Sequence, residues 1–329
     1  MSVKQTKSGE VEGRTVERPV LIIAGPTASG KSALGVDVAE HFTGTVINAD
    51  SQQVYKELRI VTARPSVADE NRVPHRLFGV LSGRESCSAG RWTELAAAEI
   101  EACFVAGRLP VVVGGTGMYL KSLVEGLSPI PEVAQSVRDE ATALHAKLGA
   151  EAFHAEVQKL DPEIAARLPA GDTQRLIRAW EVATATGRRL SDWQSAPRIQ
   201  ILENVRFAQI ALVPEREKLY AGIDARFAWM VDHGALDEIK ALMALNLDPE
   251  LPVMKALGVP ELIAHVKGEM SRDDAIAKAQ QFSRNYAKRQ LTWVRSQLPN
   301  AHIFRAQYSE SFREEIFSFV HEFLLTGRT

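Results

Sequence analysis

Residues 25–32 read Gly-Pro-Thr-Ala-Ser-Gly-Lys-Ser, and this stretch decides the fold that we expect. It matches the pattern G-x-x-x-x-G-K-[ST], whose glycines let backbone N–H groups turn toward phosphate oxygens. An apolar run at 19–24 precedes it and a helical pattern starts at Ser32, which is the strand–loop–helix context that such a loop requires. Lys31 would contact the terminal phosphates, and the Ser32 hydroxyl suits Mg²⁺. The predicted phosphate-binding residues are Gly25, Pro26, Thr27, Ala28, Ser29, Gly30, Lys31 and Ser32.

Apolar runs and helical patterns alternate along much of the chain. Short continuous apolar runs are typical of strands buried on both faces of a parallel sheet. Strands that alternate with helices imply right-handed crossovers. We therefore expect an α/β fold, a P-loop NTPase-like doubly wound parallel sheet. Besides 19–24, the predicted strands are 45–49, 110–113, 205–213 and 302–305, and the predicted helices are 32–42, 92–106, 216–245, 273–297 and 312–325.

The pattern changes in the middle of the chain. Between 133 and 199, helical spacing continues without a convincing strand. This predicts a helical insertion domain at 133–199, with the prolines of 126–131 marking a hinge into it. The remaining segments are a polar, disordered tail at 1–18, a catalytic α/β core formed by 19–132 and 200–310, and a C-terminal helix within 311–329.

Composition bounds the possible locations and partners. With 45% hydrophobic and 24% charged residues and no apolar run of membrane-spanning length, the chain suits a soluble globular protein without a membrane partner. Cys87 and Cys103 form no metal-type pair, which indicates free thiols in a reducing compartment, and we expect a cytoplasmic location. The formal net charge of −2 provides no global attraction to nucleic acid, so such binding must come from local basic patches.

The usual partners of NTP hydrolysis are missing from the sequence. A Walker B strand ends in an acidic residue that holds Mg²⁺, but the strand predicted at 110–113 continues Gly114-Gly115-Thr116-Gly117. The guanine-reading motif N-K-x-D is also absent. This disfavours motor and switch NTPases and favours small group-transfer enzymes, although ATP remains a candidate ligand of the loop.

Asp50 follows the second predicted strand. Ligands of open α/β sheets bind outside the carboxyl ends of the strands, so we expect Asp50 beside the phosphate loop. A carboxylate there can take a proton from an incoming nucleophile, but an aspartate at this position can equally cap a helix. The polar run Ser51, Gln52, Gln53 that follows favours an acceptor-reading loop, because amides pair well with adenine.

Together these segments resemble the tRNA dimethylallyltransferase family, also called tRNA isopentenyltransferases. The resemblance extends from about 19 to 300. It departs from the family at Arg76, where a second histidine is expected after His75, and at Val259, where the family often has tyrosine. The matching stretches are GPTASGKS at 25–32, DSQQVY at 50–55, TARP at 62–65, GGTGMYL at 114–120, DTQRLIRAWEV at 172–182, DARFAWM at 224–230 and YAKRQLTWVR at 286–295.

The resemblance implies a reaction and the residues that carry it. The donor is dimethylallyl pyrophosphate, the acceptor is N6 of the adenosine just 3′ of the anticodon in tRNAs that read codons starting with U, and Mg²⁺ assists. Asp50 would take the N6 proton, and Lys31 and Thr27 would offset charge on the leaving group. Thr116 resembles the family's threonine at the reaction centre, and Arg226 resembles the arginine that clamps the pyrophosphate. From position alone, Thr116 could instead cap a turn and Arg226 could form a surface salt bridge.

Several basic segments offer contacts to RNA. The segment 174–178 matches the family's tRNA-contacting stretch, where Arg175 and Arg178 share a helix face, and Arg138 matches another contact position. From 284 to 305 there are five Arg and Lys residues and no acidic one, interleaved with Tyr286 and Trp293. This composition suits backbone contacts and stacking, but a solvated helix face and core aromatics would look the same. The predicted tRNA-binding residues are Asp50, Ser51, Gln52, Gln53, Thr116, Arg138, Gln174, Arg175, Leu176, Ile177 and Arg178.

Three other functions fit parts of the sequence. A small-molecule P-loop kinase would use ATP and Asp50 as base, but it needs neither the long helical insertion nor the basic stretch at 284–305. An adenylate isopentenyltransferase would prenylate free nucleotide and would lack the 174–178 segment. A non-catalytic RNA-binding protein would not need Lys31, Ser32 and Asp50 together. We expect the tRNA-modifying enzyme to act as a monomer.

Overall fold

The computed structural model describes residues 17–326 and contains one six-stranded sheet in which all pairs of neighbouring strands are parallel. The strand order is β3-β2-β4-β1-β5-β6, so the order reverses at the central strand β1. The α/β prediction with a doubly wound parallel sheet is thereby confirmed. The strands are β1 (Arg18–Ala24), β2 (Gly44–Asn48), β3 (His75–Arg76), β4 (Leu109–Gly114), β5 (Val205–Leu212) and β6 (His302–Phe304).

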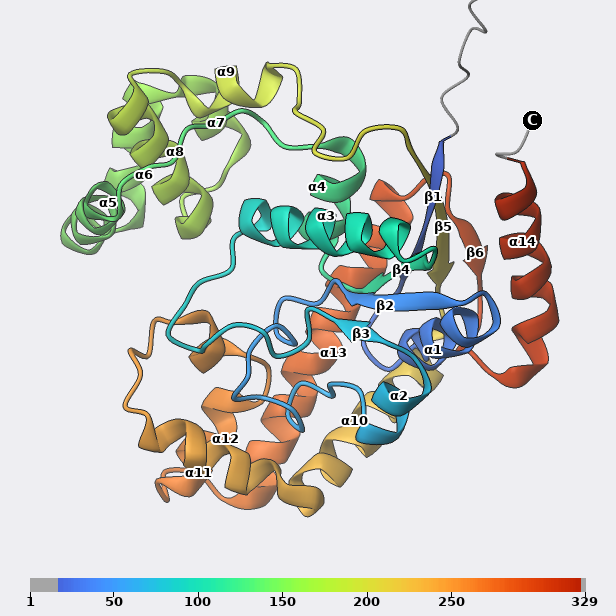
Figure 1. The fold of residues 1–329 in the computed structure, drawn as a ribbon. Helices are drawn as coiled ribbons and strands as arrows, with labels where there is room; N and C mark the ends of the chain where they lie inside the picture. The colour runs from blue at the N-terminus through green and yellow to red at the C-terminus, as the bar shows by residue number, and fades with distance from the viewer. Residues whose placement is uncertain (1–16, 327–329) are drawn as a thin grey trace, which may run out of the picture. The chain divides into compact units, whose positions relative to one another are not determined.

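Helices cover both faces of this sheet (Figure 1). Helices α1 (Lys31–His41) and α14 (Arg313–Leu325) pack on one face, and the other face is covered by α3 (Ala89–Val105), α4 (Gly117–Glu125), α10 (Arg216–Met230) and α13 (Arg272–Gln297). Strands β1 and β4 are apolar on both faces because both faces are covered. In β1, for example, Leu21 and Ile23 belong to one hydrophobic core and Val20 and Ile22 to the other.

The helix predicted over 216–245 is interrupted. Helix α10 is followed by a π-helical turn, η1 (Val231–Ala235), and then by α11 (Leu236–Ala244). Inside the turn, Gly234 has a φ of 103° and His233 is also non-helical. The apolar spacing continues through the break, so spacing alone did not reveal it. Strand β3 and the helices α2 (Val67–Arg72), α4 and α12 (Val259–Val266) were also not predicted from the sequence.

Residues 125–200 form a second compact unit, distinct from the unit formed by the rest of the described chain. It is built from helices and has its own hydrophobic core, which includes Phe153, Leu176 and Trp180. Leu127 and Ile199 exchange two backbone hydrogen bonds, so the two ends of this unit lie side by side. The predicted insertion, 133–199, lies within these bounds. Its helices are α5 (Gln135–Leu148), α6 (Ala150–Leu160), α7 (Pro162–Arg167), α8 (Thr173–Thr186) and α9 (Leu190–Ser195).

The ends of the chain differ in one respect from the sequence analysis. Arg18, placed in the predicted tail, begins β1 and pairs with Val205. Residues 1–16 lie outside the described part, and so do 327–329 of the predicted C-terminal helix. A 3₁₀ turn at Glu310–Phe312 leads into α14. Among residues 17–326, no helix is both long and apolar enough to cross a membrane.

Candidate active site

The phosphate loop joins the carboxyl end of the central strand β1 to α1, as the sequence predicts. Gly30 precedes the helix with a φ of 86°, a region that glycine occupies without strain. Gly25 is required for space, since a Cβ there would lie 2.8 Å from the Ser29 hydroxyl oxygen and 3.1 Å from the Leu212 carbonyl oxygen. The loop therefore leads directly into the N-terminus of α1, a favourable place for an anion.

Lys31 is almost completely buried, with 9% of its surface exposed. Its Nζ donates to the Pro26 carbonyl oxygen at 3.2 Å. Burial lowers the pKa of Lys31 to about 8, an effect that the negative charge of Asp50 opposes and the positive charge of Arg226 reinforces. A buried ammonium with few partners gains strongly from a bound anion.

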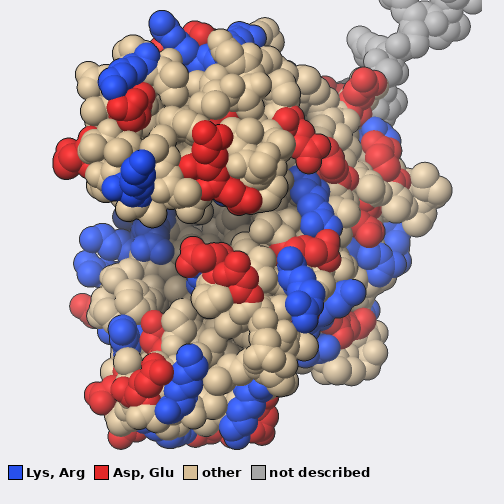
Figure 2. All heavy atoms as spheres, turned by 90° about the vertical axis from the view of Figure 1, so that its left-hand side faces the viewer, with Lys and Arg blue, Asp and Glu red and all other residues tan. Residues whose placement is uncertain are grey.

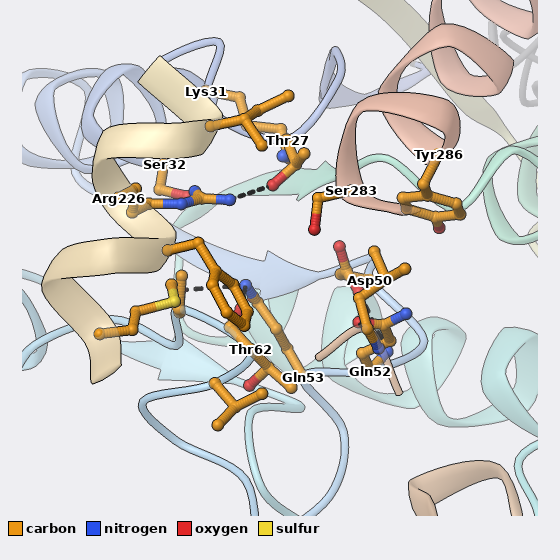
Figure 3. Close-up of a pocket in the computed structure, with 16 residues that line it drawn as sticks. Thr27, Lys31, Ser32, Asp50, Gln52, Gln53, Thr62, Arg226, Ser283 and Tyr286 are labelled. Atoms are coloured by element: carbon orange, nitrogen blue, oxygen red, sulfur yellow. Dashed lines mark hydrogen bonds between the residues drawn. The ribbon is translucent and has the colours of Figure 1, made fainter. Parts of the chain in front are cut away.

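Arg226 reaches the same place from α10, on a distant segment of the chain (Figure 3). Its Nη2 donates to the Thr27 hydroxyl of the phosphate loop. Burial lowers the pKa of Arg226, and Asp50 opposes that shift. The structure thus brings the arginine predicted to clamp the pyrophosphate next to the predicted donor loop, and it is not part of a surface salt bridge.

Asp50 lines the same pocket. Its Oδ1 accepts a hydrogen bond from the Gln52 backbone N–H at 3.0 Å, and its own N–H donates to Oδ1 of Asn48 at 2.8 Å. Within the described chain, its Oδ2 has no hydrogen-bond partner. One oxygen thus holds a turn and not the start of a helix, while the other has no partner among the described residues. The role of Asp50 as general base stays a prediction.

Thr116 follows β4 and is hydrogen-bonded to the loop that carries Asp50. Its hydroxyl accepts from the Ser51 N–H at 2.9 Å and donates to the Ser51 hydroxyl at 3.3 Å. The two chain segments also touch at Gly114, where a Cβ would lie 2.1 Å from the Ala49 carbonyl oxygen. The Thr116 hydroxyl thus helps to hold the loop that carries Asp50, although Thr116 is not among the residues that line the pocket.

The two glutamines after Asp50 fix the walls of the pocket. Nε2 of Gln53 donates to the carbonyl oxygens of Thr62 and Ala63 at 2.8 and 3.1 Å. Oε1 of Gln52 accepts from the Leu257 N–H at 3.4 Å. Both side chains line the pocket, and one end of each amide is bonded to the backbone. Their expected contact with adenine stays a prediction.

Helix α13 supplies pocket residues that were not predicted as such from the sequence, where Tyr286 was considered only for stacking on RNA or for the core. Ser283, Tyr286 and Gln290 lie on one face of this helix at helical spacing, and the first two line the pocket. Gln290 is buried and bridges two loops, because its Oε1 accepts from the Thr27 N–H at 2.9 Å and its Nε2 donates to the Gly115 carbonyl oxygen at 3.0 Å. The sequence of α13 was interpreted only as a basic stripe. The signal for buried site residues was the spacing of polar residues at i, i+3 and i+7 on an otherwise apolar face of the helix.

The pocket has a polar end and an apolar side (Figure 3). Thr27, Lys31 and Ser32 form the polar end. Ser32 is exposed to the pocket and Asp50 also lines it, so oxygen ligands of the kind that Mg²⁺ uses are present. Among the described residues there is no cluster of three or more His, Cys, Asp or Glu that could hold a metal ion. The apolar side is lined by Val61, Ala63, Ile223, Phe227, Met230 and Leu257.

The predicted tRNA contacts in the unit 125–200 differ in accessibility. Arg138, Gln174 and Arg175 are exposed, but Leu176 is completely buried, so its side chain is not available to RNA. Arg175 pairs with Asp172 at 3.2 Å. Arg178 forms a shorter ion pair than Arg175, since its Nη1 lies 2.5 Å from a carboxylate oxygen of the buried Glu181. Ile177 is half-buried.

The basic stretch at 284–305 is only partly a surface feature. Lys288, Arg289 and Arg295 are exposed, but Arg284 pairs with Asp224 at 2.6 Å. Trp293 packs against the core and against Gly117, where a Cβ would lie 2.4 Å from the indole ring. Figure 2 shows Lys and Arg interspersed with Asp and Glu over the face that it draws.

Comparisons with known proteins identify the family. A family model described as IPP transferase matches residues 53–297, and one described as isopentenyl transferase matches 18–78. The chain is 57% identical over 287 residues to a tRNA dimethylallyltransferase of Rhodospirillum centenum (87% of this chain, 91% of that protein). It is 52% identical over 309 residues to one of Paramagnetospirillum magneticum (94% and 98%).

Solved structures agree with the sequence matches. A full-length tRNA isopentenylpyrophosphate transferase from Bacillus halodurans superimposes with a TM-score of 0.69 at 31% identity, covering 94% of this chain and 98% of the other. A eukaryotic dimethylallyltransferase described as acting on tRNA gives a TM-score of 0.79 at 26% identity, covering 94% and 80%. The resemblance found in the sequence is confirmed. Since the first family model covers most of the chain and the relatives align over nearly all of it, the chain belongs to the IPP transferase family, the tRNA dimethylallyltransferases.

Proposed function

We propose that this protein transfers a dimethylallyl group from dimethylallyl pyrophosphate to N6 of the adenosine 3′ of the anticodon, in tRNAs that read codons starting with U. The product is N6-isopentenyladenosine. One observation carries the proposal: a single pocket combines a phosphate loop, an apolar side and a carboxylate with a free oxygen. A pyrophosphate ester with a short hydrocarbon chain, attacked by a weak nitrogen nucleophile, needs each of these three features.

The polar end of the pocket suits the pyrophosphate of the donor. The Lys31 ammonium, the Arg226 guanidinium and the N-terminus of α1 all lie there. The bond between the prenyl carbon and the pyrophosphate oxygen breaks during transfer, and its electron pair leaves with the pyrophosphate. Two buried cations next to that oxygen stabilise the growing negative charge. When bound through Ser32 and the phosphates, Mg²⁺ would neutralise part of the same charge.

The acceptor nitrogen belongs beside Asp50. The lone pair of N6 is delocalised into the adenine ring, so the nitrogen needs an acceptor for its proton as the new C–N bond forms. The free Oδ2 of Asp50 is suited to take that proton, since Oδ1 is held by the Gln52 N–H. Thr116 would support this arrangement through its hydrogen bonds to Ser51.

The unit 125–200 is proposed to contact the anticodon stem-loop. The eukaryotic neighbour is described as acting on tRNA, and this unit exposes basic side chains, including Arg138 and Arg175. Because these groups would contact phosphates and release counterions, we expect tRNA binding to weaken as the salt concentration rises. We further propose that the enzyme works as a monomer in the cytoplasm, where its tRNA substrate is found.

A direct test is mass analysis of tRNA nucleosides after incubation with dimethylallyl pyrophosphate. We expect an adenosine that gains one five-carbon prenyl unit, and no such product with Lys31→Ala. Parallel reactions with ATP, or with AMP in place of tRNA, separate the alternatives. Turnover of ATP with a small metabolite would indicate a kinase, and prenylation of AMP in preference to tRNA would indicate an adenylate isopentenyltransferase. A competition experiment with ATP shows whether it also enters the phosphate loop.

A further inference from the structure

A short segment opposite the phosphate loop is held in place from outside the pocket. Residues 61–63 line the pocket, and the backbone just before them binds the side chain of Glu238 from α11. The Glu238 carboxylate accepts from three consecutive N–H groups, those of Arg59, Ile60 and Val61, the last two at 2.9 Å. Consecutive N–H groups that point to one spot form an anion-binding concavity, and here a residue of the chain itself fills it.

The same segment is held from the pocket side as well. Gln53 binds the carbonyl oxygens of Thr62 and Ala63, and the Ala63 N–H donates to the Ile60 carbonyl oxygen at 2.9 Å. Ala63 has a φ of 53°, which L-residues rarely adopt. A turn with such a residue needs support from its surroundings, and Glu238 and Gln53 provide it from opposite sides.

The break between α10 and α11 determines where Glu238 lies. Gly234, with its φ of 103°, changes the direction of the helix four residues before Glu238. Gly234 also packs on the segment, since a Cβ there would lie 3.1 Å from Cδ1 of Ile60. Breaks of this kind inside helices often occur at functional sites. Here the break allows one helix to supply Arg226 to the donor end and the next to supply Glu238 to the opposite wall.

We propose that Glu238 is a positioning residue that fixes the wall 61–63 against the prenyl chain of the donor. This inference rests on the proposed function. The pyrophosphate is assigned to Lys31 and Arg226, whereas Val61 lies with Phe227 on the apolar side of the pocket. Loss of the Glu238 carboxylate leaves three N–H groups without their common acceptor, so the wall moves while the phosphate contacts remain. Loss of the Glu238 carboxylate should therefore weaken binding of the prenyl chain and leave binding of the pyrophosphate unchanged.

Kinetics of Glu238→Gln separate these two contributions. Gln has the same shape but loses the charge that strengthens the three hydrogen bonds. We expect the KM for dimethylallyl pyrophosphate to rise about tenfold, the consequence of losing roughly one charge-assisted hydrogen bond. The Ki of inorganic pyrophosphate and the KM for tRNA should stay within about twofold of wild type. Asp237→Asn is the matched control, because Asp237 lies on the same helix and its exposed carboxylate pairs, within residues 17–326, with the exposed Lys240.

A double-mutant cycle tests whether Glu238 acts through Val61. Val61→Ala alone should also raise the donor KM, and the combined effect with Glu238→Gln should be smaller than the product of the two. The proposal would be overturned if Glu238→Gln left the donor KM unchanged or raised the pyrophosphate Ki equally. It would also be overturned if the effects of Glu238→Gln and Val61→Ala on the donor KM simply multiplied in the double variant.

Hydrogen exchange provides a readout that does not depend on catalysis. Amides of residues 59–61 should exchange faster in Glu238→Gln than in wild type or Asp237→Asn, because their shared acceptor is weakened. If the amides of residues 59–61 exchange at the same rate in Glu238→Gln and wild type, Glu238 does not position this segment, even if the enzyme is active. Absence of prenyl transfer by the wild-type protein would overturn the proposed function instead, so the two failures are distinguishable.

Discussion

Asp50 uses its two carboxylate oxygens differently, and this allows its roles to be separated. Oδ1 accepts the Gln52 N–H, whereas Oδ2 is free within the described chain. Asn in this position keeps the oxygen that holds the turn but replaces the proton-accepting oxygen by an NH₂ group, which cannot take a proton. We expect Asp50→Asn to fold normally, to keep most tRNA affinity and to lower the rate of the chemical step by roughly 10²–10⁴-fold, the usual range for a general base.

Single-turnover rates at saturating tRNA measure this effect directly. Asp50→Ala serves as the comparison, because it removes both oxygens and should be at least as slow, with looser binding of the adenine. A near-wild-type rate for Asp50→Asn would contradict the general-base role, leaving only the turn-capping role that the structure already shows for Oδ1.

Lys31 predicts a pH dependence of donor binding. Its pKa in the free enzyme is lowered to about 8 by burial, so the ammonium is charged below this pH and loses its proton above it. A bound pyrophosphate favours the charged form. We therefore expect its affinity to fall as pH rises above about 8, with proton uptake on binding in that range.

Calorimetry with inorganic pyrophosphate in buffers of different ionisation enthalpy measures this proton uptake. Lys31→Arg is the control, because a guanidinium stays charged throughout this pH range, and it also corrects for the titration of pyrophosphate itself. Identical pH profiles for the two proteins would show that Lys31 does not titrate near 8.

Most of the site residues that the sequence predicted come from contiguous motifs. The loop 25–32 and Asp50 follow buried strands, and position at the carboxyl end of a parallel strand is enough to bring them together. Arg226 came only from the family resemblance. Gln290 and Glu238 were not predicted, because their contacts join segments far apart in the sequence. The polar spacing on α13 places Gln290 on a buried helix face but does not show which two loops it bridges.

At the scale of elements, long periodic segments were predictable and short ones were not. The apolar runs of β1 and β4 and the helical patterns of α3 and α13 indicated these elements near their observed positions. Strand β3 has only two residues, His75 and Arg76, and contains no apolar residue, so the sheet and not the sequence determines it. The break at Gly234 was missed for a different reason: one glycine within an apolar helical pattern is compatible with an unbroken helix.

Helix α8 makes a prediction about salt dependence. Arg175 and Arg178 were expected to act alike, but the structure distinguishes them. Arg175 is 73% exposed in its side chain and its pair with Asp172 is solvent-accessible, whereas Arg178 is held by Glu181, whose side chain is only 2% exposed. We expect Arg175→Ala to reduce the slope of log affinity against log salt by about one unit. Arg178→Ala should reduce it less and should also destabilise the helix, since it leaves a buried carboxylate unpaired.

Filter-binding titrations with tRNA at several salt concentrations provide the slopes, and thermal unfolding provides the stability. Lys159→Ala is the control in the same unit, because Lys159 is exposed and paired with Glu156 on α6. Equal slopes for wild type and Arg175→Ala would exclude this face of α8 from the interface with RNA.

At the scale of the whole molecule, the chain has separate cores for its two units. The cluster around Phe153, Leu176 and Trp180 contains only residues of the unit 125–200, whereas the clusters on the two faces of the sheet contain none of them. Stability that comes from apolar burial is therefore largely independent in the two units. The pocket with Lys31, Asp50 and Arg226 also belongs entirely to the unit of the sheet.

This separation predicts that deletion of the unit 125–200 removes tRNA binding and leaves donor binding intact. Leu127 and Ile199 are hydrogen-bonded neighbours, so a short flexible linker can replace the unit 125–200 without pulling on β4 or β5. We expect the shortened protein to bind inorganic pyrophosphate within a few-fold of the full chain, because every proposed phosphate contact is retained. Its affinity for tRNA should fall by on the order of a hundredfold or more, since Arg138, Arg175 and Arg178 are lost with their phosphate contacts.

Calorimetry and filter binding on the same preparation measure the affinities for pyrophosphate and for tRNA, with circular dichroism to verify the fold of the sheet unit. Retention of full tRNA affinity would show that the sheet unit alone binds the RNA, and would shift attention to Lys288, Arg289 and Arg295 on α13, which remain exposed in the shortened chain.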